Sequence, residues 1–337
     1  QLSESVDSSR PEGLPGTADL VAAARRLDER LMALVAAQRE DPYSGPAILS
    51  GRAAAVFFHE IFGHRVEGSR LKQVDSGQTF LNKVGDSILP AFISVHDDPT
   101  LKSAEGIDLR GSYAYDNQGV RSSRVALVEN GVLKGFLESR SPSTEGRTSN
   151  AHGRRQPLRA VVARQGNLLV TAHQSVSEKQ LREQLRQRAR QAGLEYGLYI
   201  DDISGGFTFT GTYMPNAYQI NVLLAHRVYV DGRPDELVRG IDFIGTPLQT
   251  FSNIIAAGDQ REVFNGSCGA ESGWVPVSAV APSMLVAQVE AQRQMKGQAK
   301  SPLLPPPPAT EEGSGDRLLG QLSAAVTRAT EELTLPG

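Results

Sequence analysis

The 337-residue sequence contains one cysteine, no apolar run of membrane-spanning length and no excess of basic residues. Cys268 has no second cysteine to pair with, so an internal disulfide is excluded and one thiol needs an explanation. A transmembrane helix needs about 20 consecutive apolar residues, and their absence argues against a membrane span. The formal net charge of −3 lacks the basic footprint of a protein that binds nucleic acid directly.

The composition is otherwise that of a globular protein, with 39% hydrophobic and 22% charged residues. We expect a loose tail and a connector helix over residues 1–44, remaining from an upstream domain, and a main domain over 45–296. Residues 297–337 should form a proline-rich linker and a final amphipathic helix. Because the sequence begins at Gln1, its N-terminus could be processed; we expect a cytoplasmic protein and leave export open.

Strand patterns dominate the main domain. The predicted strands span residues 46–50, 91–96, 122–129, 132–140, 196–203, 207–214, 218–230 and 237–244. Helices are predicted from about 52, from a Ser177 capping box to Gly193 and over 246–257, while 283–292 suits either state. Between 122–129 and 132–140, Asn130-Gly131 favours a type I′ hairpin turn. Strands and helices do not alternate, which predicts an α+β fold with a largely antiparallel, β-rich body and segregated helices.

A helix is also predicted ahead of this domain, capped by Thr17 and running to about residue 38. Its apolar residues recur with helical spacing on one face, so we interpret it as a packing helix or a connector. That face comprises Leu20, Val21, Ala24, Leu27, Leu31, Leu34 and Val35.

Two histidines five positions apart, His59 and His64, are the first candidates for a metal site. Neutral imidazole is the commonest metal ligand, and Glu60 is placed to take a proton from a metal-activated water. At roughly 100° per residue, a spacing of five leaves the two side chains about 140° apart on a regular helix. A local π-bulge would bring them together, and Gly63 lowers the steric cost of that distortion. Ordinary surface or core histidines remain the alternative.

Cys268 is the candidate third ligand, in a segment rich in glycine that should turn tightly and present the sulfur from a loop. Two histidines and one thiolate form a zinc site that leaves the fourth position open, as catalysis requires. A buried structural thiol, the usual state of a free cysteine, is the alternative.

Four segments resemble the TldD/PmbA family of metalloproteases, in matching order over about three-quarters of the chain. Residues 59–68 (HEIFGHRVEG) resemble its metal-binding segment, and residues 127–136 (LVENGVLKGF) its central hairpin. Residues 149–155 (SNAHGRR) resemble the following polar loop, and residues 265–269 (NGSCG) the late cysteine segment. The histidines and the cysteine are typical of the TldD side of the family, because the PmbA-type partner lacks these ligands.

The resemblance implies a zinc-dependent peptidase that acts on unfolded or extended peptides. It implies His59, His64 and Cys268 as Zn²⁺ ligands and Glu60 as the general base. It also implies a homodimer, or a heterodimer with a PmbA-type paralogue. Family members usually have a sizeable α/β domain ahead of the metal helix, where this sequence has only the residues before His59.

Basic side chains around the polar loop are candidates for binding the peptide, through the donors of Arg140, Arg154 and Arg155 and through His152. Solvated loop charges are the alternative for the arginines. A non-catalytic, metal-stabilised module that binds peptides or a partner is the second functional hypothesis, although a purely structural zinc needs no base such as Glu60.

Overall fold

The computed structural model describes residues 2, 11–72, 79–208 and 217–294. The chain divides at Gln294 into two units, and the second unit, which carries the expected proline-rich linker and final helix, lies outside the described residues. In the described part, none of the helices is long and apolar enough to cross a membrane.

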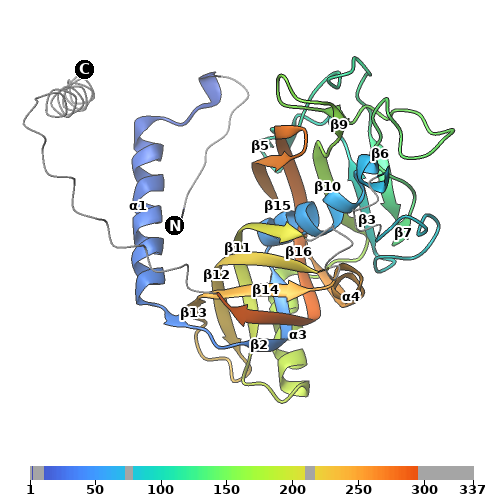
Figure 1. The fold of residues 1–337 in the computed structure, drawn as a ribbon. Coiled ribbons are helices and arrows are strands. Elements are labelled where there is room, and N and C mark those ends of the chain that lie inside the picture. Colours follow the sequence, from blue (N-terminus) through green and yellow to red (C-terminus); the bar gives the residue numbers. More distant parts are fainter. Residues whose placement is uncertain (1, 3–10, 73–78, 209–216, 295–337) are drawn as a thin grey trace, which may run out of the picture. The chain divides into compact units, whose positions relative to one another are not determined.

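A 12-stranded sheet organises the first unit (Figure 1). Its strands are β1 (Gln38–Arg39), β2 (Tyr43–Leu49), β3 (Ile93–Asp97), β6 (Val125–Glu129), β7 (Val132–Leu133), β10 (Asn167–Ala172), β11 (Tyr196–Thr208), β12 (Tyr218–Tyr229), β13 (Glu236–Arg239), β14 (Ile241–Gly245), β15 (Ile254–Ala270) and β16 (Gly273–Arg293). The order is β1-β13-β12-β11-β2-β16-β10-β3-β6-β7, with β14 beside β12 and β16 and with β15 beside β16. Most neighbours are antiparallel, and β1–β13, β2–β11 and β10–β16 are parallel. The α+β fold with a largely antiparallel body is therefore confirmed.

Helices and two small hairpins make up the other regular elements of the described residues. The helices are α1 (Thr17–Ala36), α2 (Gly51–Phe57), α3 (Glu178–Gln191) and α4 (Pro247–Ser252), with a π-helix over Phe58–Phe62 and 3₁₀ turns over Pro11–Gly13, Gly63–Arg65 and Gly68–Lys72. Two small hairpins pair β4 (Ser103–Ala104) with β5 (Ile107–Asp108) and β8 (Gly153–Arg154) with β9 (Val162–Ala163).

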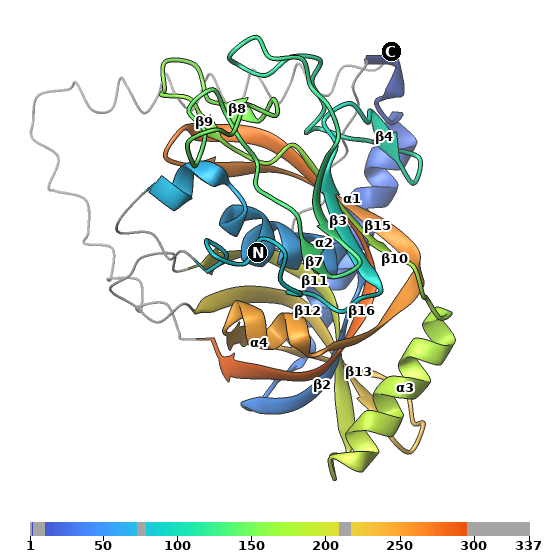
Figure 2. The same ribbon diagram turned by 90° about the vertical axis from the view of Figure 1, so that its right-hand side faces the viewer.

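Helices cover both faces of the sheet at β2. Ala47 and Leu49 point into the main core with α2, while Ile48 packs on the other face with Leu181 and Leu185 of α3. Figure 2 shows α3 on the outer side of the sheet, away from α2. A strand covered on both faces has no polar side to alternate with, which explains the continuous apolar run in this segment.

The start of α2 is set by Ser50, whose hydroxyl accepts a hydrogen bond from the Ala53 amide at 3.1 Å. Gly51 follows because a Cβ there would lie 2.8 Å from the Ala281 carbonyl oxygen of β16. The helix then buries three alanines, Val56 and Phe57. These small residues let the helix backbone lie close to the sheet, so that the residues after Phe57 enter the core.

Several predicted turns are present as expected. Ser177 and Gln180 form the capping box of α3, and the helix stops before Gly193, which has φ +70°. Asn130 and Gly131 have φ values of 48° and 81° between β6 and β7, as a type I′ turn requires.

Other predicted boundaries are wrong where tertiary pairing overrides local pattern. The helix predicted over 246–257 ends at Ser252, because Ile254 and Ala257 pair with β16. The strand predicted over 237–244 is divided at Gly240, which has φ +83°. The strand predicted over 132–140 is reduced to β7. Residues 196–208 form the single strand β11, and 209–214 lie outside the described residues. Residues 283–292 are strand, within β16.

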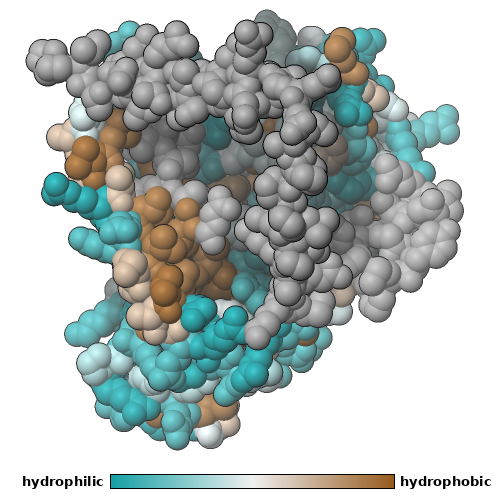
Figure 3. All heavy atoms as spheres, turned by 60° about the vertical axis from the view of Figure 1, so that its left-hand side comes forward, coloured by the Kyte–Doolittle hydropathy of each residue, from teal (hydrophilic) through white to brown (hydrophobic). Residues whose placement is uncertain are grey.

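Of the two interpretations of α1, the packing helix is not borne out in the described structure, and the connector stays a prediction. Gly16, not Thr17, is its N-cap, and none of the helix residues is buried within the described structure. Met32 and Val35 are each 62% exposed. Figure 3 views the side that carries α1 and shows apolar side chains gathered on the surface there.

Candidate metal centre

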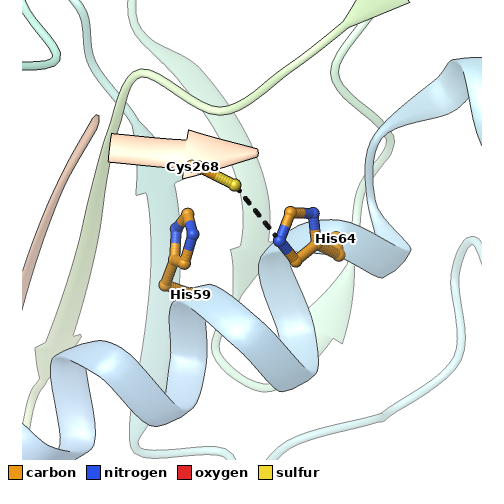
Figure 4. Close-up of side chains that lie close together, drawn as sticks. All are labelled: His59, His64 and Cys268. Carbon is orange, nitrogen blue, oxygen red and sulfur yellow. Dashed lines mark hydrogen bonds between the residues drawn. The ribbon is translucent and has the colours of Figure 1, made fainter. Parts of the chain in front are cut away.

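The π-helix brings the two histidines together. The Gly63 amide donates to the Phe58 carbonyl five residues back, so the turn is wider than an α-helical one. The rings of His59 and His64 consequently point the same way, with their centroids 5.1 Å apart (Figure 4). The distortion predicted from the five-residue spacing is therefore present.

The predicted role of Gly63, to ease the distortion of the backbone, differs from the role that the structure shows. Its φ of −57° and ψ of −47° are ordinary helical values that any residue adopts, so backbone freedom is not needed there. A Cβ at this position would instead lie 1.9 Å from Oε1 of Gln165. Gly63 thus leaves the space that the end of the Gln165 side chain occupies, and a side chain at this position would require Gln165 or the helix to shift.

Cys268 reaches the histidines from a strand. It lies in β15, where it pairs with Val275 of β16, and not in the predicted glycine-rich loop. Its sulfur faces the π-helix and lies 3.4 Å from Nε2 of His64 (Figure 4). A ladder position fixes the direction of a side chain, so the long β15–β16 hairpin delivers the thiol more rigidly than a loop would.

The three side chains fit a zinc ion. Their ligand atoms all lie within 4.8 Å of one another, and all three residues are buried. Nδ1 of His59 is buried and has no hydrogen-bond partner among the described residues. Such an orphaned nitrogen is costly unless something else satisfies it. One thiolate and two imidazoles are zinc donors that leave a fourth position open, and the geometry therefore supports the predicted donor set.

Electrostatics favours the ionised thiol. Burial raises the pKa of Cys268, but His59 and His64 outweigh burial and lower it to about 4. Burial lowers the pKa of His64, and the neighbouring Glu67 and Cys268 raise it to about 10. In the absence of metal the cluster thus holds a thiolate against protonated imidazole, and metal binding would displace those protons.

Glu60 lies at the edge of the cluster and not inside it. Its Oε2 is 3.9 Å from Nε2 of His64, and its side chain is 19% exposed. It packs beside β11, where a Cβ on Gly206 would lie 3.4 Å from Glu60 Cγ. A partly exposed carboxylate next to three buried ligands can reach a molecule that approaches the cluster from solvent.

A family model described as the PmbA/TldA metallopeptidase C-terminal domain matches residues 42–293, most of the chain. The chain belongs to this family. The matched segment contains the three candidate ligands and the whole 12-stranded sheet apart from β1.

Similar proteins carry metalloprotease names. A metalloprotease of Methanothermobacter thermautotrophicus is 28% identical over 269 residues, which are 80% of this chain and 54% of that protein. The zinc metalloprotease TldD homolog of Saccharolobus solfataricus is 23% identical over 248 residues, 73% of this chain and 51% of that protein. The chain thus spans about half the length of the curated relatives it matches.

A solved structure shows the same fold. The crystal structure of TldE from Thermococcus kodakarensis aligns with a TM-score of 0.59 at 16% identity, covering 81% of this chain and 56% of that one. At this identity the likeness establishes the architecture alone.

The predicted peptide-binding residues of this PmbA/TldA domain divide into two groups. Arg140 and Arg155 are exposed, and Arg155 donates to the Arg159 carbonyl at 3.0 Å. His152 and Arg154 are buried: Nε2 of His152 lies 3.1 Å from Oδ1 of Asp97, and the Arg154 guanidinium stacks on a tyrosine. His152 and Arg154 thus lie inside the protein with these partners, and peptide binding by the four residues stays a prediction.

Three buried polar residues beside the candidate metal centre were not predicted: Glu67, Arg164 and Gln165. Glu67 is part of the segment that resembles the family's metal-binding motif, and its position three residues after His64 was the available signal. Nothing in the sequence around Arg164 and Gln165 distinguishes them from surface residues.

Proposed function

We propose that this chain is the catalytic domain of a zinc-dependent peptidase that hydrolyses peptide bonds in unfolded or extended peptides. The observation that carries the proposal is the convergence of His59, His64 and Cys268 on one point, with the carboxylate of Glu60 beside them. The family description and the names of the relatives support metallopeptidase chemistry.

In this proposal, three residues bind the ion and Glu60 transfers the proton. Zinc bound by the three ligands would polarise the substrate carbonyl and acidify a water molecule. Glu60 accepts the proton of the attacking water and passes it to the leaving amine. The candidate ligands are buried and Glu60 is partly exposed, so its carboxylate is accessible to water while it lies beside the cluster.

The proposal includes a substrate and an assembly. The substrate is an extended peptide, and the active assembly is a homodimer or a heterodimer with a PmbA-type paralogue. The structural likeness to TldE supports the fold, and the pairing of two subunits is part of the proposal.

The deciding experiment compares the wild-type protein with Glu60→Gln. Both are loaded with zinc and incubated with an unstructured peptide, alone and with a PmbA-type paralogue, and the products are identified by mass spectrometry. The glutamine keeps the shape of Glu60 but removes the base, so we expect unchanged zinc content and hydrolysis slower by about 10²–10⁴-fold. Glu129→Gln, at an exposed carboxylate on β6, is the matched control and should cleave like the wild type.

Two outcomes would contradict the proposal. Equal cleavage by wild type and Glu60→Gln would remove Glu60 from the general-base role. Peptide binding without cleavage by the zinc-loaded wild type, with or without the paralogue, would favour the non-catalytic peptide-binding module.

A further inference from the structure

Two adjacent buried residues, Arg164 and Gln165, contact the supports of all three candidate ligands. They follow β9 and lie between the segment that carries the histidines and the hairpin that carries Cys268. Cys268 and His64 are 204 positions apart in the sequence, so their separation depends on whatever joins these two supports.

Arg164 is the direct link between them. Its Nε donates to Oε1 of Glu67 at 3.2 Å, on the histidine side. Its Nη2 donates to the Cys268 carbonyl at 2.9 Å, and its Nη1 donates to Ser272 Oγ at 3.0 Å and to the Gly273 carbonyl at 3.1 Å, on the hairpin side. One rigid guanidinium thus holds both the strand position of Cys268 and the turn that follows it.

Glu67 carries this link to His64. Its Oε2 lies 3.0 Å from Nδ1 of His64 and also accepts from Nε of Arg70 at 2.9 Å. A carboxylate only accepts hydrogen bonds, so Nδ1 of His64 must carry the proton. In the neutral imidazole that would bind a metal, the lone pair is then on Nε2, the atom that faces Cys268.

Gln165 completes the set at the π-helix. Its Nε2 donates to the His59 carbonyl at 3.3 Å, and its side chain lies against Gly63. The widened turn is therefore held from outside the helix at the residue that precedes Glu60.

We propose that Glu67, Arg164 and Gln165 are positioning residues that set the geometry of the metal ligands and the tautomer of His64. The proposal rests on the proposed zinc function, since it assigns these residues a role toward that ion. The competing explanation is that they form an ordinary buried ion pair that only stabilises the fold.

The chain offers a matched control for that explanation. Glu40 is also fully buried and accepts two hydrogen bonds from Arg227, at 2.6 and 2.9 Å, and one from Tyr196 at 3.0 Å. These partners lie on β11 and β12, and none of them contacts a candidate ligand. Glu40→Gln therefore removes a comparable buried charge without touching the cluster.

The test measures metal binding by metal-free protein, with Zn²⁺ in competition with a chelator and with Co²⁺ by its absorption spectrum. Glu67→Gln replaces one carboxylate oxygen with an NH₂ group. In either orientation of the amide, this NH₂ group would face a hydrogen-bond donor of His64, Arg70 or Arg164. In Arg164→Lys a single ammonium cannot span both supports. We expect zinc affinity to fall about 10- to 100-fold in each, with a changed cobalt spectrum, and to be unchanged in Glu40→Gln.

The outcomes separate this inference from the function on which it rests. If the wild type binds no zinc, the proposed metal centre is wrong and the inference falls with it. If the wild type binds zinc and Glu67→Gln and Arg164→Lys match it in affinity and cobalt spectrum, only the positioning role is wrong. Should Arg164→Lys fail to fold, Gln165→Met, which loses the donor to the His59 carbonyl, takes its place with the same expected loss.

Discussion

At the scale of single residues, Cys268 is the position whose role depends most on its surroundings. Burial raises the pKa of the Cys268 thiol, but His59 and His64 lower it to about 4, so its ionisation depends on the two histidines. Cys268→Ala should remove the zinc, about one ion per chain, that the wild type is expected to contain. Metal analysis by mass spectrometry, on protein purified without a histidine tag, provides the measurement.

The neighbouring Ser267 provides the control for this substitution. Ser267 is exposed on the same strand, so Ser267→Ala removes one side-chain atom from the hairpin, as Cys268→Ala does. The Ser267→Ala protein should keep its zinc. His59→Ala and His64→Ala should lose zinc as Cys268→Ala does. Full zinc occupancy in Cys268→Ala would exclude the thiolate from the site.

The sequence indicated the candidate ligands but not the buried residues that contact their supports. His59, His64 and Cys268 could be predicted because metal chemistry restricts the residue types and because the segments resemble a known family. Arg164 and Gln165 could not, because their function comes from contacts with Glu67, the Cys268 carbonyl and the His59 carbonyl, all distant in sequence. Burial of an arginine is a tertiary property that local composition does not reveal.

At the scale of elements, the π-helix follows from simple geometry. Two histidines five residues apart can share one ion only if the turn between them widens, so the spacing alone predicted the distortion. The sequence did not reveal what stabilises the bulge, because Gln165 approaches it from another part of the chain.

Gly63→Ala tests this packing. The new Cβ would meet Oε1 of Gln165 at 1.9 Å, so Gln165 or the helix must move. We expect overpacking to lower the free energy of unfolding by about 1–3 kcal/mol, measured by chemical denaturation, and zinc affinity to fall as well. Gly135→Ala is the control, because its Cβ would meet only the end of the flexible Arg147 side chain at 3.4 Å. Wild-type stability in Gly63→Ala would show that the close approach is not needed.

At the scale of the whole molecule, long-range pairing decides what local pattern leaves open. β16 runs from Gly273 to Arg293 and joins β2, β10, β14 and β15, although it contains Pro276 and Pro282. Prolines and glycines are poor local signals for a strand, so most of this hairpin was not predicted. The fold class was still predictable, because the excess of strand patterns over helix patterns extends through the whole domain.

At this scale we also expect the protein to form a dimer, and the exposed apolar residues of α1 are the reason. Leu31, Met32 and Val35 lie on a 20-residue helix without a buried residue in the described structure. Contiguous apolar surface of this kind is typical of an interaction site. We expect the helix to pair with the same helix of a second copy, so that sedimentation velocity at micromolar concentration gives about twice the chain mass of 36.2 kDa.

Variants on this helix make the expectation specific. Met32→Glu combined with Val35→Glu places charges in the apolar face and should shift the protein to the 36.2-kDa monomer, while Glu29→Gln, an exposed polar position on the same helix, should leave the dimer intact. If the double variant remains a dimer, the interface lies elsewhere. If the wild type is already monomeric and becomes heavier only with a PmbA-type paralogue, the apolar face of α1 belongs to a heterodimer and self-pairing is wrong.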